Sequence, residues 1–153
     1  MTNILEKIIS DKKESLRLFK KENSINLLEK KIKELNCFFD FKNTIHKNKK
    51  ISLISEIKRA SPSAGIIIKD FNHLDIAKMY IDNGATCLSV LTEEKYFLGN
   101  LQHILDIKKN YKIPILAKDF FIDPYQVALS KSFGCDCILI IISALENKLA
   151  DEI

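Results

Sequence analysis

The sequence predicts an α/β fold with a parallel sheet, and three observations lead to this prediction. From residue 51 onward, short β-rich apolar segments alternate with helical segments of about 10 residues. Turn residues separate these segments: a helix begins at Asn72, and Gly84 and Gly134 suit helix C-termini. Residues 136–142 are apolar on both faces, as expected for a strand covered on both sides.

The order of the elements follows from these signals. The predicted strands cover about residues 51–57, 86–91, 114–117 and 136–142. The predicted helices that follow them cover residues 72–84, 101–109, 123–134 and the chain from residue 147 onward. Before the first strand, helical spacing of apolar residues predicts helices over 3–20, 24–35 and 38–46. The chain thus divides into a helical extension, residues 1–50, and an α/β part, residues 51–153.

The composition fits one domain with a hydrophobic core. The 153 residues are 46% hydrophobic and 29% charged, which is too apolar for a disordered chain. The longest apolar run is far shorter than the roughly 18–20 residues that span a bilayer, and Glu6 and Lys7 interrupt the N-terminal segment where a signal peptide would be apolar. The four cysteines lack metal-ligand spacing. We therefore expect a cytoplasmic protein with no membrane contact and no metal site.

The number of predicted strands leaves two architectures open. Parallel strands joined by helices form either open sheets or closed barrels, and a closed (β/α)8 barrel needs about 250 residues. The four predicted strand–helix units are therefore either a small open sheet or the first half of a barrel.

Charged residues at two strand ends mark a candidate site, because parallel α/β folds place their sites at the carboxyl ends of strands. Alternation along the first strand puts Glu56 and Lys58 on one face with Ile54, and Lys118 ends the third strand. Two amines and a carboxylate at one opening suit an anionic substrate and general acid catalysis. A purely structural ion pair at a strand end is the alternative.

Loops at the same ends carry further candidates. Ser61 and Ser63 beside Gly65 form either a phosphate-binding flap or an ordinary turn. Tyr96 and Phe97 are either a lid over core atoms or a stacking platform for an aromatic ligand. The three histidines, at positions 46, 73 and 103, are scattered, and we interpret them as surface residues.

The first third of the chain is basic. Residues 1–50 carry 13 Lys and Arg against 7 Asp and Glu, whereas residues 51–153 carry 11 against 13. A nucleic-acid-binding arm is one interpretation. A solvated face of amphipathic helices is favoured, because acidic residues are mixed among the lysines and no aromatic residues interleave with them. We expect no nucleic-acid partner.

Three motifs resemble one enzyme family. They are Glu56–Ser63 (EIKRASPS), Leu88–Phe97 (LSVLTEEKYF) and Pro114–Gln126 (PILAKDFFIDPYQ). In order and spacing they resemble indole-3-glycerol-phosphate synthase of tryptophan biosynthesis, which some bacteria fuse to phosphoribosylanthranilate isomerase. The family also has a helical extension before its first strand, so the resemblance covers essentially the whole chain.

The resemblance implies a TIM (β/α)8 barrel of which only the first four βα units are present. It implies a lyase that closes a ring in a phosphosugar–anthranilate substrate, 1-(2-carboxyphenylamino)-1-deoxyribulose 5-phosphate. The reaction loses CO2 and water and needs no cofactor or metal. The family takes its other catalytic residues and main phosphate loops from the second half of the barrel. We therefore expect a truncated chain that is inactive alone.

The resemblance also implies roles for individual residues. Lys118 resembles the general acid that protonates the substrate carbonyl, Lys58 the second lysine that contacts anionic groups, and Glu56 their paired carboxylate. Ser61 lies in the loop near the substrate. The residues expected to line the pocket are Phe97 and Phe120, beside the anthranilate ring, and Leu139 on the fourth strand.

Three other functions are alternatives to this one. Another phosphosugar barrel, such as phosphoribosylanthranilate isomerase, would need a Cys/Asp pair in place of Glu56, Lys58 and Lys118. A non-catalytic remnant or oligomerising module would keep the fold without the reaction, although the three polar residues are intact. A nucleic-acid binder would depend on the basic residues 1–50 and would show steeply salt-dependent affinity.

Overall fold

The computed structural model describes residues 4–47, 51–145 and 147–153, and it has an α/β fold. A four-stranded parallel sheet has the order β1-β4-β5-β6. Its strands are β1 (Ile54–Ile57), β4 (Cys87–Leu91), β5 (Ile115–Lys118) and β6 (Cys137–Ile138). Two short antiparallel strands, β2 (Ala60–Ser61) and β3 (Gly65–Ile66), form a hairpin after β1.

Helices lie before, between and after the strands. The extension contains α1 (Ile4–Glu22), α2 (Ile25–Glu34) and α3 (Phe41–Lys47), and the sheet is connected by α4 (His73–Asp82), α5 (Leu101–Asn110) and α6 (Tyr125–Ser132). A short 3-10 helix, η1 (Ile142–Ala144), and α7 (Asn147–Glu152) follow β6. Within the described ranges, no helix is both long and apolar enough to cross a membrane.

The helix boundaries predicted at Asn72, Gly84 and Gly134 are confirmed. The Asn72 side chain accepts hydrogen bonds from the backbone N–H groups of Leu74 and Asp75, at 3.0 and 3.3 Å, and so caps α4. Gly84 and Gly134 have φ of 90° and 93°, the left-handed conformation that ends a helix before a strand. These local signals set where each helix gives way to the next strand.

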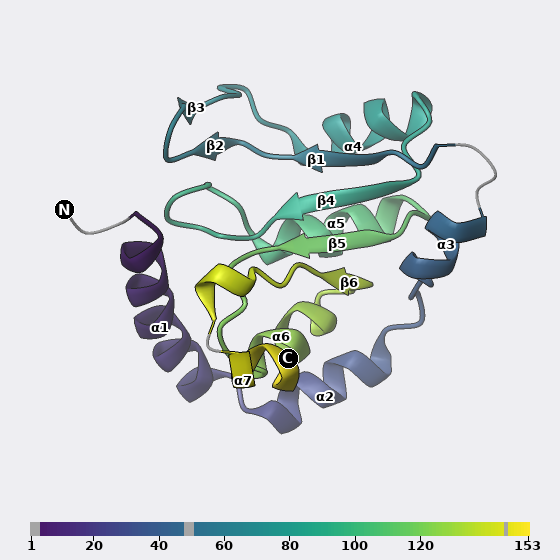
Figure 1. Cartoon of the computed structure of the whole chain (residues 1–153). Coiled ribbons are helices and arrows are strands. Elements are labelled where there is room, and N and C mark those ends of the chain that lie inside the picture. Colours follow the sequence, from purple (N-terminus) through teal and green to yellow (C-terminus); the bar gives the residue numbers. More distant parts are fainter. Residues whose placement is uncertain (1–3, 48–50, 146) are drawn as a thin grey trace.

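The hydrophobic core lies between one face of the sheet and the helices. Residues from alternate positions of the strands form it together with residues of α4 and α5, and these helices lie behind the sheet in Figure 1. The strand residues of this core are Ile57, Leu88, Val90, Ile115 and Ala117, all at most 1% exposed. Strand alternation then directs the other set of side chains, including Glu56 and Lys118, to the opposite face.

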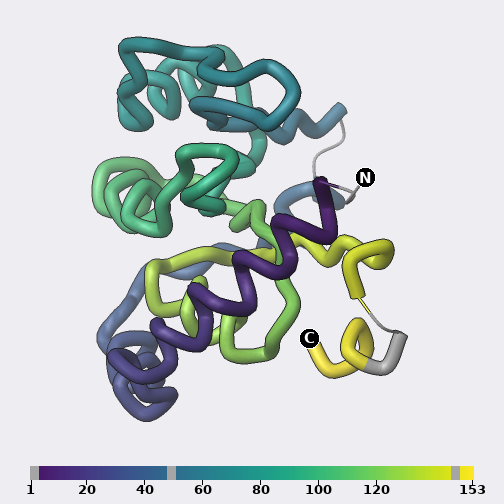
Figure 2. The backbone as a smooth tube through the Cα atoms, turned by 90° about the vertical axis from the view of Figure 1, so that its left-hand side faces the viewer, coloured from purple at the N-terminus to yellow at the C-terminus, as the bar shows by residue number. Residues whose placement is uncertain are grey.

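The helical extension places α1 at the carboxyl ends of the strands and α3 at their amino ends (Figure 1). Viewed toward those carboxyl ends, α1 runs across the front of the molecule (Figure 2). The extension is tied to the start of α6, because Lys20 forms an ion pair with Asp123 at 2.6 Å and the Tyr125 hydroxyl donates to the carbonyl of Asn23 at 2.8 Å. Residue 3, the first of the predicted helix 3–20, lies outside the described residues.

The prediction of a long fourth strand over 136–142 is wrong. Only Cys137 and Ile138 pair, and residues 142–144 form a 3-10 helix. β6 is at the edge of the sheet and pairs only with β5 in the described chain, and that strand ends at Lys118, one residue beyond the partner of Ile138. An apolar run forms a strand only where a partner strand continues beside it.

Two other elements begin later in the structure than predicted. The strand predicted over 51–57 begins at Ile54, because its neighbour β4 begins only at Cys87. The helix predicted over 38–46 covers 41–47, because the Phe39 backbone N–H donates to the Asp136 carboxylate at 2.7 Å and holds the preceding residues out of the helix. The strands predicted over 86–91 and 114–117 are each within one residue of the observed bounds.

Candidate active site

Glu56, Lys58 and Lys118 form one hydrogen-bonded cluster at the carboxyl ends of β1 and β5. Lys58 Nζ donates to Glu56 Oε1 at 2.6 Å, and Lys118 Nζ donates to Glu56 Oε2 at 2.5 Å. The side chains of Glu56, Lys58 and Lys118 are 26%, 34% and 39% exposed, so solvent reaches the cluster. The structure brings together the three residues that alternation and strand position had placed on one face.

The two lysines keep Glu56 ionised. Burial raises the pKa of a carboxyl group, but the hydrogen bonds and charges of Lys118 and Lys58 outweigh it and leave the pKa of Glu56 below its usual value. The cluster contains one carboxylate and two ammonium groups, so its net charge is positive. The cluster can therefore attract an anion and offers ammonium protons to a bound oxygen.

Ser61 lies in the hairpin that follows β1, at the same end of the sheet (Figure 1). Its hydroxyl accepts the Ala64 backbone N–H at 3.2 Å and lies 3.4 Å from the Ser63 hydroxyl. Gly65 closes this turn with φ of 64°. The segment is an ordered serine turn, and Ser61 is part of its hydrogen bonding.

Phe97 and Phe120 come from the loops after β4 and β5, and they meet. Their ring centroids lie 6.2 Å apart with planes tilted by 44°, a favourable aromatic geometry. Phe97 also accepts the Ala60 backbone N–H on its carbonyl at 3.3 Å, which links this loop to the hairpin. Tyr96 instead points to α1, where its hydroxyl donates to Asp11.

A buried carboxylate that sequence reasoning missed shapes the loop of Phe97. Glu93 is 4% exposed and accepts the backbone N–H groups of Lys95, Tyr96 and Phe97 at 3.2, 2.6 and 3.1 Å. Its position in the loop that follows a strand was the only signal in the sequence, and nothing in the pattern distinguishes it from the exposed Glu94.

Leu139 follows β6 and is half-buried. Register pairs Leu116 with Cys137, so alternation assigns Leu139 to the face that carries Leu116 and Lys118. The strand has already ended at Ile138, however, so the sheet does not hold Leu139, and its place in the pocket wall stays a prediction.

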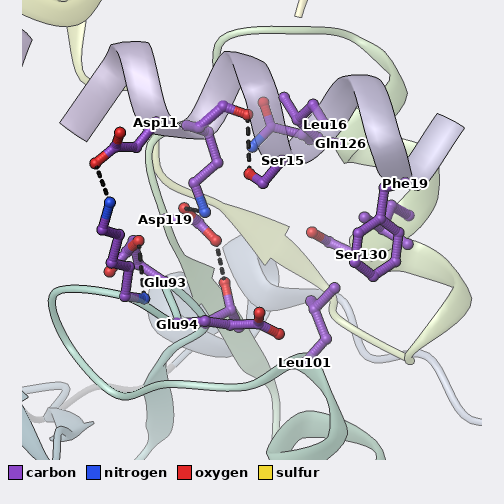
Figure 3. A pocket seen from close by; sticks show the side chains of 14 residues that line it. Asp11, Ser15, Leu16, Phe19, Glu93, Glu94, Leu101, Asp119, Gln126 and Ser130 are labelled. Carbon is purple, nitrogen blue, oxygen red and sulfur yellow. Dashed lines mark hydrogen bonds and ion pairs between the residues drawn. The ribbon is translucent and has the colours of Figure 1, made fainter. Parts of the chain in front are cut away.

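A small cavity of about 140 Å³ lies between α1 and the ends of β4 and β5 (Figure 3). Binding pockets for organic ligands usually have about 300–1,000 Å³. Its polar wall is an ion pair of Lys12 with Asp119 at 2.7 Å and a hydrogen bond from the Thr92 hydroxyl to Asp119 at 2.8 Å. This cavity is smaller than such binding pockets, and none of Glu56, Lys58 and Lys118 lines it. The partner of Asp119 could not be read from the sequence, because it depends on where α1 docks.

The interpretation of all three histidines as surface residues is wrong for two of them. His73 and His103 are half-buried and stacked, with ring centroids 4.4 Å apart, and His73 contacts Asp106 at 3.1 Å. They meet because α4 and α5 are neighbours and both begin at the same end of the sheet. Among the residues described, no group of three or more His, Cys, Asp or Glu side chains could hold a metal ion.

Comparison with known proteins identifies the family. The model of the indole-3-glycerol phosphate synthase family matches residues 5–153. Proteins named indole-3-glycerol phosphate synthase are 45% identical in Aliarcobacter butzleri, over 98% of this chain and 58% of the relative, and 42% identical in Desulforamulus reducens, over 93% and 54%. The chain therefore spans about half the length of the curated relatives it matches, and it belongs to the indole-3-glycerol phosphate synthase family.

Proposed function

We propose that this chain is the N-terminal part of an indole-3-glycerol phosphate synthase with a (β/α)8 barrel, of which it supplies the first four strand–helix units. The complete cytoplasmic enzyme closes the indole ring of 1-(2-carboxyphenylamino)-1-deoxyribulose 5-phosphate and releases CO2 and water. The observation that carries the proposal is the cluster in which Lys58 and Lys118 share the carboxylate of Glu56. Family membership over residues 5–153 supports it.

Ring closure needs a proton donor at the substrate carbonyl. The ring carbon that bears the carboxylate attacks the carbonyl carbon, a C–C bond forms, and Lys118 gives its proton to the oxygen, which becomes a hydroxyl group. The electron pair released by loss of CO2 neutralises the positive charge that develops on the anilino system. The hydroxyl group then takes a proton from a lysine ammonium group and leaves as water. The adjacent ring CH2 loses a proton to a base of the complete site, and the new double bond completes the indole. All steps are proton transfers and bond rearrangements of the substrate, so the proposed mechanism uses no cofactor.

The remaining residues position the substrate and protect it from water. Lys58 attracts anionic groups, and Glu56 holds both ammonium groups in place until the substrate enters. The paired rings of Phe97 and Phe120 form an apolar wall for the anthranilate ring, and exclusion of water there favours decarboxylation. Ser61 would lie near the substrate in the first loop, and Leu139, just after β6, would line the pocket.

The rest of the barrel completes the site in this proposal. The strands at the two sheet edges, β1 and β6, would pair with strands from the second half. That half would also supply the main phosphate loops and further catalytic side chains. We therefore expect the 153-residue chain to be inactive without it.

The test is complementation. The chain is assayed for indole glycerol phosphate formation alone and together with the part of the Aliarcobacter butzleri relative that lies beyond the match. We expect turnover only in the mixture, and a Lys118→Met chain should lower it by about 100-fold or more, as for the loss of a general acid. A mixture that binds a substrate analogue or folds but never turns over would refute the proposal and favour a non-catalytic remnant.

A further inference from the structure

We infer that Thr92 and Asp119 are positioning residues for Lys118: they fix the main chain from which its ammonium group reaches Glu56. The inference rests on the proposed function and deepens it, because it names residues outside the cluster that determine the direction of the proposed proton donor.

Thr92 forms hydrogen bonds with two consecutive residues, Lys118 and Asp119. Its backbone N–H donates to the Lys118 carbonyl oxygen at 3.1 Å, and its hydroxyl donates to Asp119 Oδ2 at 2.8 Å. Thr92 is 3% exposed, so water hardly competes for these bonds. One buried residue just after β4 thus fixes the position of the main chain where β5 ends.

Asp119 is held from a second side. Its Oδ1 accepts the Phe120 backbone N–H at 2.7 Å and pairs with Lys12 Nζ of α1, also at 2.7 Å. The side chains of Asp119 and Lys12 are only 10% and 12% exposed. A nearly buried carboxylate needs such a partner, because an unpaired buried charge is costly. The ion pair therefore fixes Asp119 between α1 and β4.

Fixing Asp119 also fixes the direction of Lys118. Lys118 is the last residue of β5, so strand alternation directs its Cα–Cβ bond to the face of the cluster. Holding the next residue, Asp119, toward α1 fixes the main chain at that point. Lys118 has a long, flexible side chain that is 39% exposed, and its ammonium must cross the end of β4 to reach Glu56. Positioning from the main chain removes part of this freedom before substrate binds.

The experiment follows the carboxyl carbon of Glu56 by 13C NMR during a pH titration of the 153-residue chain. The hydrogen bond from Lys118 lowers the pKa of Glu56, so the titration midpoint reports whether Lys118 still contacts it. Lys118→Met gives the midpoint without that contact, which we expect about 1 pH unit higher. Because no turnover is measured, failure of the proposed function leaves this result interpretable.

We expect Asp119→Ala to raise the midpoint by at least half of the Lys118→Met shift. Thr92→Val should also raise it, and Thr92→Ser, which keeps the hydroxyl, should restore it. Asp11→Asn is the matched control, because Asp11 also joins α1 to a strand-end loop but contacts Lys95 and Tyr96. It should leave the midpoint unchanged.

Three outcomes overturn the inference: an unchanged midpoint in Asp119→Ala and Thr92→Val while Lys118→Met shifts it, an equal shift in Asp11→Asn, or no shift in Lys118→Met itself. If Asp119→Ala fails to fold, the Thr92→Val and Thr92→Ser pair decides by the same criterion, since the first change is nearly isosteric and the second removes only a methyl group.

Discussion

Lys118 Nζ and Glu56 Oε2 lie 2.5 Å apart although a whole strand separates their backbones. Glu56 belongs to β1 and Lys118 to β5, and β4 lies between them in the sheet. Register places Ser89 of β4 opposite both Glu56 and Leu116, so all three residues share a face. Lys118 itself lies opposite Leu91, so the ion pair crosses β4 diagonally between Leu91 and the small side chain of Ser89.

We predict that enlarging Ser89 separates the pair. Ser89→Leu adds bulk between Glu56 and Lys118 and should raise the titration midpoint of the Glu56 carboxyl group toward that of Lys118→Met. In the complemented enzyme, turnover should fall by about 10-fold or more, since small misplacements of a reacting group are costly. Ser89→Ala, which adds no bulk, should keep the midpoint and most of the turnover. Equal behaviour of the two variants would contradict this account.

Gly99 is predicted to be essential for the loop that carries Phe97. A Cβ atom there would lie 2.3 Å from the Leu91 carbonyl oxygen, and backbone cannot yield as a flexible side chain can. Gly99→Ala should lower the free energy of unfolding by about 1–3 kcal/mol, the usual cost of overpacking. Denaturant titration measures this. The adjacent Leu98, with φ of 51°, is the control, since Leu98→Gly should cost little.

Local sequence patterns were sufficient to predict much of the fold and the cluster of Glu56, Lys58 and Lys118. Asn72 and Gly84 mark the ends of α4, and alternation places Glu56 and Lys58 on one face, because these features depend on neighbouring residues only. The length of β6 was not predictable, since it depends on where β5 ends. Contacts between distant segments, such as Lys12 with Asp119, likewise depend on how helices dock after they form.

Asp136 is predicted to be a main determinant of stability at the amino ends of the strands. Its side chain is fully buried, pairs with Lys108 at 2.5 Å, and accepts the backbone N–H groups of Phe39 and Ile115 at 2.7 and 2.8 Å. Asp136→Ala leaves an uncompensated buried ammonium and two unpaired donors. It should lower the free energy of unfolding by roughly 3–5 kcal/mol, measured by denaturant titration.

The exposed pair of Lys78 and Asp82 provides the contrast to this buried pair. It is just as short, at 2.5 Å, but its side chains are 61% and 55% exposed. Asp82→Ala should leave the free energy of unfolding almost unchanged, because solvent screens such pairs. If the two substitutions had similar effects, burial would not be the reason for the importance of Asp136.

His103 is predicted to make folding sensitive to pH. Burial, followed by the nearby His73, lowers the pKa of His103 to about 4 from an ordinary value of 6.5. Between these two values the unfolded chain holds a proton on this residue that the folded chain does not. Stability is therefore fully present above pH 6.5 and is lost progressively as the pH falls toward 4.

His103→Gln removes this titration and should flatten the fall in unfolding free energy between pH 6.5 and 4 in denaturant titrations at a series of pH values. His46→Gln is the control, because His46 is exposed at the end of α3 and should leave the slope unchanged. Direct NMR titration of His103 supplies an independent check. A midpoint near 6.5 would mean that the ring is hydrated despite its stacking on His73, and the pH dependence would then need another source.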